Sequence, residues 1–154
     1  MSAQPEFPPK TILVPTDFSD CSDRAVAYAA EVATRVSASL VLLHVSPPPP
    51  DFGYPLPESA AFQVAEWTKT LRERRDAAMA ALTEESKPFD AMVEISLRVE
   101  EGDAVEAIVK AAADSGADLV VVGSHGRRGL KRAMLGSVAE RVVRLSPVPT
   151  LVVR

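Results

Sequence analysis

The chain has 154 residues, of which 47% are hydrophobic and 25% are charged, and its formal net charge at pH 7 is -4. This length and composition predict one globular domain over residues 1–154 that buries a full hydrophobic core. The acidic balance argues against a nucleic-acid-binding protein, whose surface is usually basic. We also expect a cytoplasmic protein with no membrane partner, because no apolar run approaches the roughly 18 residues that span a bilayer and the N-terminus lacks a signal-peptide pattern.

Hydrophobic patterning predicts strands that alternate with helices along the chain. After a short tail (1–9), the predicted strands are 10–17, 39–46, 91–100, 117–123 and 147–154, and the predicted helices are 17–38, 58–87, 103–116 and 136–146. Nearly continuous apolar strands between helices are typical of a parallel sheet that is covered on both faces. The predicted fold class is therefore α/β, an open five-stranded parallel sheet in a doubly wound arrangement.

A proline-rich segment, PPPPDFGYPLP (47–57), separates the second predicted strand from the second predicted helix. Because proline lacks an amide donor, we interpret this segment as an exposed loop. In the helix that follows, an apolar stripe is predicted to face the core; it consists of Trp67, Leu71, Ala78 and Leu82.

The segment GSHGRRGLKRAMLGS (123–137) follows the fourth predicted strand and combines glycines with four basic residues. The missing Cβ atoms of Gly123 and Gly126 let a ligand approach the backbone closely. Ser137 is a candidate N-cap for the next helix, whose free amides suit an anion. In doubly wound sheets, ligands bind beyond the carboxyl ends of the strands near the switch point. The segment therefore predicts a phosphate site beside the end of the first strand.

A simpler interpretation of this segment is a solvated basic loop whose glycines only permit turns. The segment fits neither the G-x-x-x-x-G-K-[ST] loop nor the G-x-G-x-x-G fingerprint of other nucleotide sites. The local pattern alone leaves both interpretations open.

The spacing G-x2-G-x9-G-[ST], at Gly123, Gly126, Gly136 and Ser137, is the nucleotide-binding signature of the universal stress proteins. The chain resembles this family over nearly its whole length, in the segments ILVPTDFSD, LVLLHV, GDAVEAIVKAAADSGADLVVVGSHGRRG and SVAERVVRLSPVPTLVV. The resemblance implies that ATP binds between the ends of the first and fourth strands. It also implies a role in stress response or signalling.

The resemblance implies a set of nucleotide-binding residues at these strand ends. They are Pro15, Thr16, Asp17, Val45, Val122, Gly123, Gly126, Arg127, Gly136, Ser137 and Val138. Asp17 would face the nucleotide and is a candidate Mg²⁺ ligand, since carboxylates suit this ion; its alternative role is to cap the first helix. The backbone of Val45 would contact adenine. We expect His44 to be a core residue, and direct phosphate contact by His125 is the less favoured of its two interpretations.

Three functions stay open at this stage. The favoured one is an ATP-binding protein with at most slow hydrolysis, because no general base is apparent. The second is a nucleotide-free dimeric interaction protein of the same fold. The third, an enzyme that hydrolyses nucleotides or transfers adenylate, is disfavoured because H-x-G-H and S-G-G-x-D-S motifs are absent. The C-terminal strand (149–153) is an expected sheet edge and, by resemblance to the family, a homodimer interface.

Overall fold

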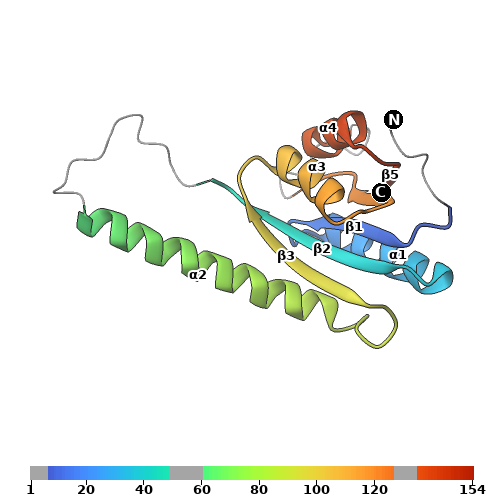
Figure 1. The fold of residues 1–154 in the computed structure, drawn as a ribbon, viewed down its shortest axis with the longest axis horizontal. Coiled ribbons are helices and arrows are strands. Elements are labelled where there is room, and N and C mark those ends of the chain that lie inside the picture. Colours follow the sequence, from blue (N-terminus) through green and yellow to red (C-terminus); the bar gives the residue numbers. More distant parts are fainter. Residues whose placement is uncertain (1–6, 49–60, 127–134) are drawn as a thin grey trace.

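The computed structural model describes residues 7–48, 61–126 and 135–154 (Figure 1). Its elements are, in chain order, β1 (Thr11–Thr16), α1 (Asp20–Val36), β2 (Ser39–Ser46), α2 (Ala61–Ser86), β3 (Ile95–Glu101), α3 (Ala104–Asp114), β4 (Leu119–Gly123), α4 (Ser137–Leu145) and β5 (Thr150–Val153). This alternation confirms the predicted α/β class. The tail and the proline-rich segment fall mostly outside the described residues, and the single domain over 1–154 stays a prediction.

The five strands form one parallel sheet in the order β3-β2-β1-β4-β5. From β1 in the centre, the chain first builds β2 and β3 on one side and then β4 and β5 on the other. The direction of winding therefore changes between β1 and β4. At such a switch point the connections leave in opposite directions, which opens a crevice beyond the carboxyl ends of the two strands.

Helices cover both faces of the sheet, with α2 on one side and α3 and α4 on the other (Figure 1). Because successive strand residues point to opposite faces, each strand supplies both layers of the core. Ile12, Val14, Leu40 and Leu42 pack with α1 and the C-terminal half of α2, whereas Leu13, Val41, Leu43 and Val120 pack with α3 and α4. Each fully buried side chain of this size contributes about 1.5–3 kcal/mol, so both layers hold the strand ends in place.

Two sequence predictions differ from the structure in the region of α2. Ala78 and Leu82 are buried as predicted, but Trp67 and Leu71 are only partly buried, because the N-terminal half of α2 extends beyond the sheet (Figure 1). The strand predicted at 91–100 begins only at Ile95. The residues before it form turns that an alternating apolar pattern does not reveal, closed by backbone hydrogen bonds such as that from Met92 to Phe89.

Candidate functional site

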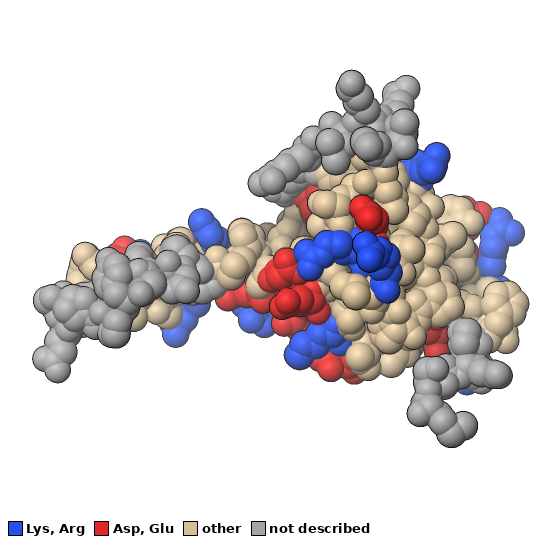
Figure 2. Space-filling view, turned by 90° about the horizontal axis from the view of Figure 1, so that it is seen from above, with Lys and Arg blue, Asp and Glu red and all other residues tan. Residues whose placement is uncertain are grey.

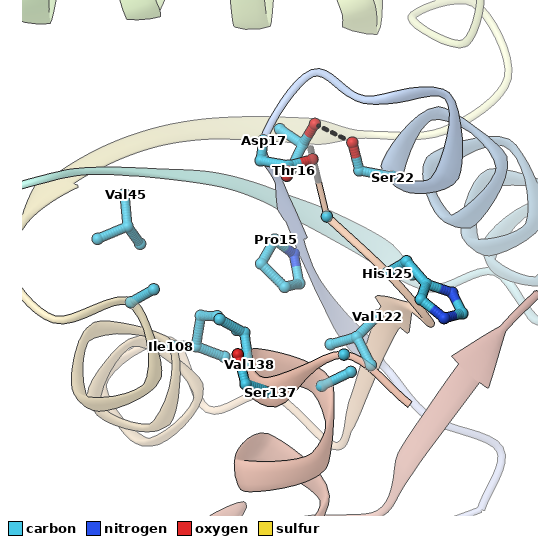
Figure 3. A pocket seen from close by; sticks show the side chains of 15 residues that line it. Pro15, Thr16, Asp17, Ser22, Val45, Ile108, Val122, His125, Ser137 and Val138 are labelled. Carbon is cyan, nitrogen blue, oxygen red and sulfur yellow. Dashed lines mark hydrogen bonds between the residues drawn. The ribbon is translucent and has the colours of Figure 1, made fainter. Parts of the chain in front are cut away.

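A pocket of about 360 Å³ opens where the carboxyl ends of β1 and β4 face the first turn of α4 (Figure 3). Its volume falls within the range of small-molecule sites, about 300–1,000 Å³. The pocket is lined by Pro15, Thr16, Asp17, Ser22, Val45, Ala104, Ile108, Val122, Gly123, His125, Gly126, Gly136, Ser137, Val138 and Ala139.

Every predicted site residue that the structure describes lines this one pocket. Arg127 lies outside the described residues, as do the other three basic residues of its segment. Sequence reasoning did not assign Ser22, Ala104 and Ile108 to the site. Ile108 belongs to the apolar stripe of α3, which predicts a core position equally well. Only the topology could have indicated Ala104 and Ile108, because α3 follows β3 and therefore begins at the same edge of the sheet as the pocket.

The pocket exists because β1 and β4 separate early. Their pairing is limited to Ile12 with Leu119 and Leu13 with Val120. Pro15 lies beyond the last pair, and proline has no amide with which to continue a ladder. The space between the strands is therefore open at Pro15, whose ring forms part of an apolar wall together with Val45 and Ile108 (Figure 3).

The glycines of the segment after β4 bring separate parts of the chain together. A Cβ at Gly123 would lie 2.9 Å from the backbone oxygen of Cys21, and one at Gly126 would lie 2.8 Å from Oδ2 of Asp17. Both distances are too short for real Cβ atoms. Gly123 does line the pocket, but the predicted reason for a glycine there was wrong. The space beside its Cα is occupied by the first turn of α1 and not by a ligand. Gly126 instead leaves room for the Asp17 carboxylate at the pocket.

Asp17 does not cap α1, so the alternative role considered for it was wrong. The N-cap is Ser19, whose hydroxyl accepts a hydrogen bond from the amide of Ser22 (3.3 Å), while Ser22 Oγ accepts one from the amide of Ser19 (3.0 Å). Asp17 Oδ1 accepts hydrogen bonds from the amide and the hydroxyl of Ser19, at 3.2 and 2.6 Å. Ser19 thus closes the helix end and holds the Asp17 carboxylate at the pocket.

The N-terminus of α4 is open by comparison. Its N-cap is Gly136, one residue before the predicted Ser137, and no side chain makes a cap hydrogen bond there. Gly136 donates its amide to the carbonyl of Ser124 (2.7 Å), which fixes the start of the helix next to β4. The first-turn amides of a helix have no intrahelical acceptor and carry the positive end of the helix dipole. The exposed residues Ser137 and Val138 thus present an anion-binding helix end to the pocket.

Two histidines near the pocket have protein partners. His44 Nδ1 lies 2.9 Å from the carbonyl oxygen of Thr16, and its ring stacks on Phe18 with 4.6 Å between centroids. His125 Nδ1 lies 2.9 Å from Ser124 Oγ. Burial raises the pKa of the neighbouring Cys21 thiol, but the hydrogen bonds of Ser124 and the backbone of His125, together with the charge of Arg24, lower that pKa by more. His44 is thus held by protein partners, but it is only half-buried, so the prediction that it is a core residue was wrong in that respect.

One carboxyl outside the pocket reaches it through a single hydrogen bond. Glu85, in the last turn of α2, accepts a hydrogen bond at Oε1 from Thr16 Oγ1 (2.9 Å). Burial raises the pKa of Glu85 to about 7; the hydrogen bond from Thr16 opposes this rise, and the carboxylates of Asp23 and Asp17 add to it.

The described residues do not assemble a resident metal site. No group of three histidine, cysteine, aspartate or glutamate side chains gathers among them. Asp17 is the one carboxylate among the described residues that line the pocket, and its Oδ1 already accepts two hydrogen bonds. A magnesium ion at this pocket would depend on ligands that a bound phosphate brings with it.

The surface gives two further findings. On the face that carries α3 and α4, basic and acidic side chains lie next to one another (Figure 2); Arg98, for example, pairs with Glu100 and Asp114. None of the helices within the described ranges combines the length and the apolar character needed to cross a membrane.

Comparison with known proteins identifies the family. The model of the universal stress protein family matches residues 9–154. The universal stress protein MJ0577 of Methanocaldococcus jannaschii is 34% identical, with 94% of each chain covered, and its solved structure superposes with a TM-score of 0.75. UspA of Lactobacillus plantarum is 25% identical over 94% of this chain and 97% of its own, with a TM-score of 0.77.

A third structure is a universal stress protein in complex with cAMP. It is 28% identical to this chain, covers 95% of this chain and 97% of its own, and gives a TM-score of 0.63. The sequence resemblance and the predicted doubly wound sheet are thereby confirmed. This chain belongs to the universal stress protein family.

Proposed function

We propose that this protein binds ATP, or another adenine nucleotide, in the pocket between β1, β4 and α4, and that it acts as a nucleotide-dependent module in stress response. The observation that carries the proposal is that one pocket combines two chemically different surfaces. It has an apolar wall and, in the same lining, the uncapped helix terminus at Gly136. A relative of the same family has been crystallised with cAMP, which supports an adenine nucleotide as the ligand.

These two surfaces suggest how the nucleotide lies. The base would stack against Pro15 and Ile108, with the backbone of Val45 supplying contacts to adenine. The phosphates would lie at the amides of Ser137 and Val138, where the helix dipole stabilises negative charge. The Asp17 carboxylate is repelled by phosphate, so we place it at the sugar, where it can accept hydrogen bonds from hydroxyl groups.

The simplest test is to denature the purified protein and to identify released nucleotides by mass spectrometry. We expect an adenine nucleotide at a substantial fraction of one per chain. Calorimetric titration of nucleotide-free protein with ATP is the second arm, and we expect saturable binding. Absence of both released nucleotide and ATP binding would favour the alternative function, a nucleotide-free interaction protein.

Hydrolysis at this site should be slow. Asp17 and His125 are the titratable side chains among the described residues that line the pocket. Ser19 holds the first, and Ser124 lies at the Nδ1 of the second. Efficient phosphoryl transfer requires a positioned base together with a cation at the γ-phosphate. We therefore propose a binding protein with weak ATPase activity at most, which a phosphate-release assay would measure; rapid release would contradict this.

We also propose a homodimer through the C-terminal strand (149–153). In the described sheet β5 is an edge strand that pairs with β4 alone, and edge strands readily pair with another chain. The neighbouring Val143 and Leu145 of α4 are exposed, at 45% and 56%. Sedimentation equilibrium at micromolar concentration should give twice the mass of the chain, and a single monomer mass would contradict the proposal. A cytoplasmic location is likewise our proposal.

A further inference from the structure

The last turn of α2 reaches the end of β1 through the side chain of Glu85. There Glu85 Oε1 is 2.9 Å from the hydroxyl of Thr16, which is 6% exposed and lines the pocket beside Asp17. The other carboxyl oxygen of Glu85 is buried and has no hydrogen-bond partner among the described residues. One carboxyl on a helix that is otherwise remote from the pocket is therefore a single hydrogen bond away from it.

The groups that face Glu85 disfavour its charged form. Asp23 of α1 and Asp17 after β1 both oppose its ionisation, as burial does. Within the described ranges no salt bridge joins Glu85 to a basic side chain. His44 of β2 contacts the backbone carbonyl of Thr16 and not the carboxyl group of Glu85. Glu85 therefore changes its charge near neutral pH, with a pKa of about 7.

Protonation of Glu85 weakens its hold on the Thr16 hydroxyl, because a neutral carboxyl is a weaker hydrogen-bond acceptor than a carboxylate. The Thr16 hydroxyl has one proton and two acceptors within reach, Glu85 Oε1 at 2.9 Å and Ser22 Oγ at 3.1 Å. When Glu85 is ionised, this proton is held by the carboxylate. When Glu85 is protonated, its proton can be directed to Asp23 or to Thr16. In either case the Thr16 proton is more available to Ser22, which also lines the pocket. Figure 3 shows the hydrogen bond between Thr16 and Ser22 beside Asp17.

We propose that Glu85 is a positioning residue of the nucleotide pocket, that it acts through Thr16, and that loss of its proton weakens the binding of nucleotide polyphosphates. The inference rests on the proposed nucleotide function and adds a regulatory property to it. An ionised Glu85 adds a negative charge behind Asp17, on the side of the pocket that already repels phosphate. By linkage, a bound polyphosphate raises the proton affinity of Glu85, so binding near pH 7 takes up protons.

The test is calorimetric titration of the whole chain with ATP between about pH 6 and about pH 8.5. It compares the wild type with Glu85→Gln, which keeps the shape of the side chain without its charge. The matched control is Glu84→Gln, which removes the same charge one residue away, where Glu84 is exposed and pairs with Lys87. The titration of the ATP phosphates is common to all three proteins. We expect the wild type and the control to lose about fivefold more affinity over this range than Glu85→Gln.

Proton uptake provides a second readout that a purely structural role would not change. Titrations at pH 7 in two buffers of different ionisation enthalpy should show greater proton uptake by the wild type than by Glu85→Gln. If Glu85→Gln does not fold, Thr16→Val serves instead, because it removes the hydroxyl that bonds to Glu85. Thr16→Val should flatten the dependence of ATP affinity on pH, whereas Thr16→Ser, which keeps the hydroxyl, should preserve it.

The outcomes separate the two proposals. If Glu85→Gln and Thr16→Val keep the pH profile and proton uptake of the wild type, the role of Glu85 is overturned while nucleotide binding stands. If the nucleotide-free wild type does not bind ATP at any pH, the proposed function falls, and the role of Glu85 falls with it.

Discussion

Three helices begin at the carboxyl edge of the sheet, and their first turns differ in one respect. α1 is closed by the hydroxyl of Ser19, and α3 is closed by Asp103, whose Oδ1 accepts hydrogen bonds from the amides of Val105 (3.0 Å) and Glu106 (3.1 Å). α4 begins at Ser137, and its N-cap Gly136 supplies no side-chain cap. A side-chain cap satisfies one or two of the free first-turn amides and stabilises the fold, whereas an uncapped end leaves these amides for a ligand. The cap residue thus distinguishes the helix end that we propose for phosphate from the two capped ends.

The largest expected effect comes from supplying α4 with a negative charge. Ser137→Asp places a carboxylate at the first residue of α4, where it interacts favourably with the helix dipole and occupies the proposed phosphate position. We expect the protein to gain about 0.3–1 kcal/mol of stability and to bind ATP about 30-fold more weakly. Urea denaturation and calorimetric titration measure the two quantities.

The control for this change is Ser137→Asn, which has nearly the same shape without the charge. We expect its ATP affinity to stay within about threefold of the wild type, because the amides remain available. If Ser137→Asp binds ATP as tightly as Ser137→Asn does, the phosphates do not lie at this helix end.

Gly123, which ends β4, and Gly126, which follows it, should separate stability from binding. Gly123→Ala forces a Cβ to within 2.9 Å of the backbone oxygen of Cys21, so we expect a loss of about 2 kcal/mol in the free energy of unfolding. Gly126→Ala meets instead the carboxylate of Asp17, a side chain that can rotate. Displacing Asp17 should weaken ATP binding about tenfold at a stability cost below about 1 kcal/mol. Equal stability losses in the two variants would contradict this assignment.

The pH dependence of stability should depend on Glu85. Its pKa in the folded protein is about 7, above its ordinary value of 4.5, so the folded state binds more protons than the unfolded state between these values. This contribution is complete below about pH 4.5 and is lost as the pH rises through 7. Because Glu85 is only partly buried, we expect its contribution to be about 1–2 kcal/mol.

Urea denaturation at pH 5 and pH 8 checks this expectation. Relative to Glu85→Gln, the wild type should lose that amount of stability between the two pH values, and Glu84→Gln should behave like the wild type. A wild type and Glu85→Gln with parallel stability profiles would show that Glu85 does not titrate in this range.

The smallest effect is expected at the capped end of α1. Ser19→Ala removes the cap, which should cost about 1 kcal/mol of stability. It also removes the hydroxyl that lies 2.6 Å from Asp17, so ATP affinity should fall by no more than about threefold. Thermal unfolding and calorimetry of the same sample measure both, and a larger loss of affinity than of stability would indicate that α1 contacts the ligand directly.

The fold class and the general place of the pocket could be predicted because both depend on local patterns. Apolar runs define the strands, and their alternation with helices requires a parallel sheet with a crevice at its switch point. The remainder depends on contacts between distant residues. Glu85 and Thr16 are 69 positions apart, and no pattern near either residue indicates the other. The start of α4 at Gly136 likewise follows from its hydrogen bond to Ser124 across the undescribed segment 127–134.

The contrast between capped and uncapped helix ends is tested most directly by the backbone amides themselves. In ¹⁵N-resolved NMR spectra of the nucleotide-free protein, titration with ATP should shift the amides of Ser137, Val138 and Ala139, and titration with adenosine, which lacks phosphates, should leave them nearly unchanged. The first-turn amides of α3, at Val105 and Glu106, should show no such difference between ATP and adenosine. If ATP and adenosine shift the α4 amides equally, or if ATP leaves them unshifted while it binds, the open end of α4 is not the phosphate site.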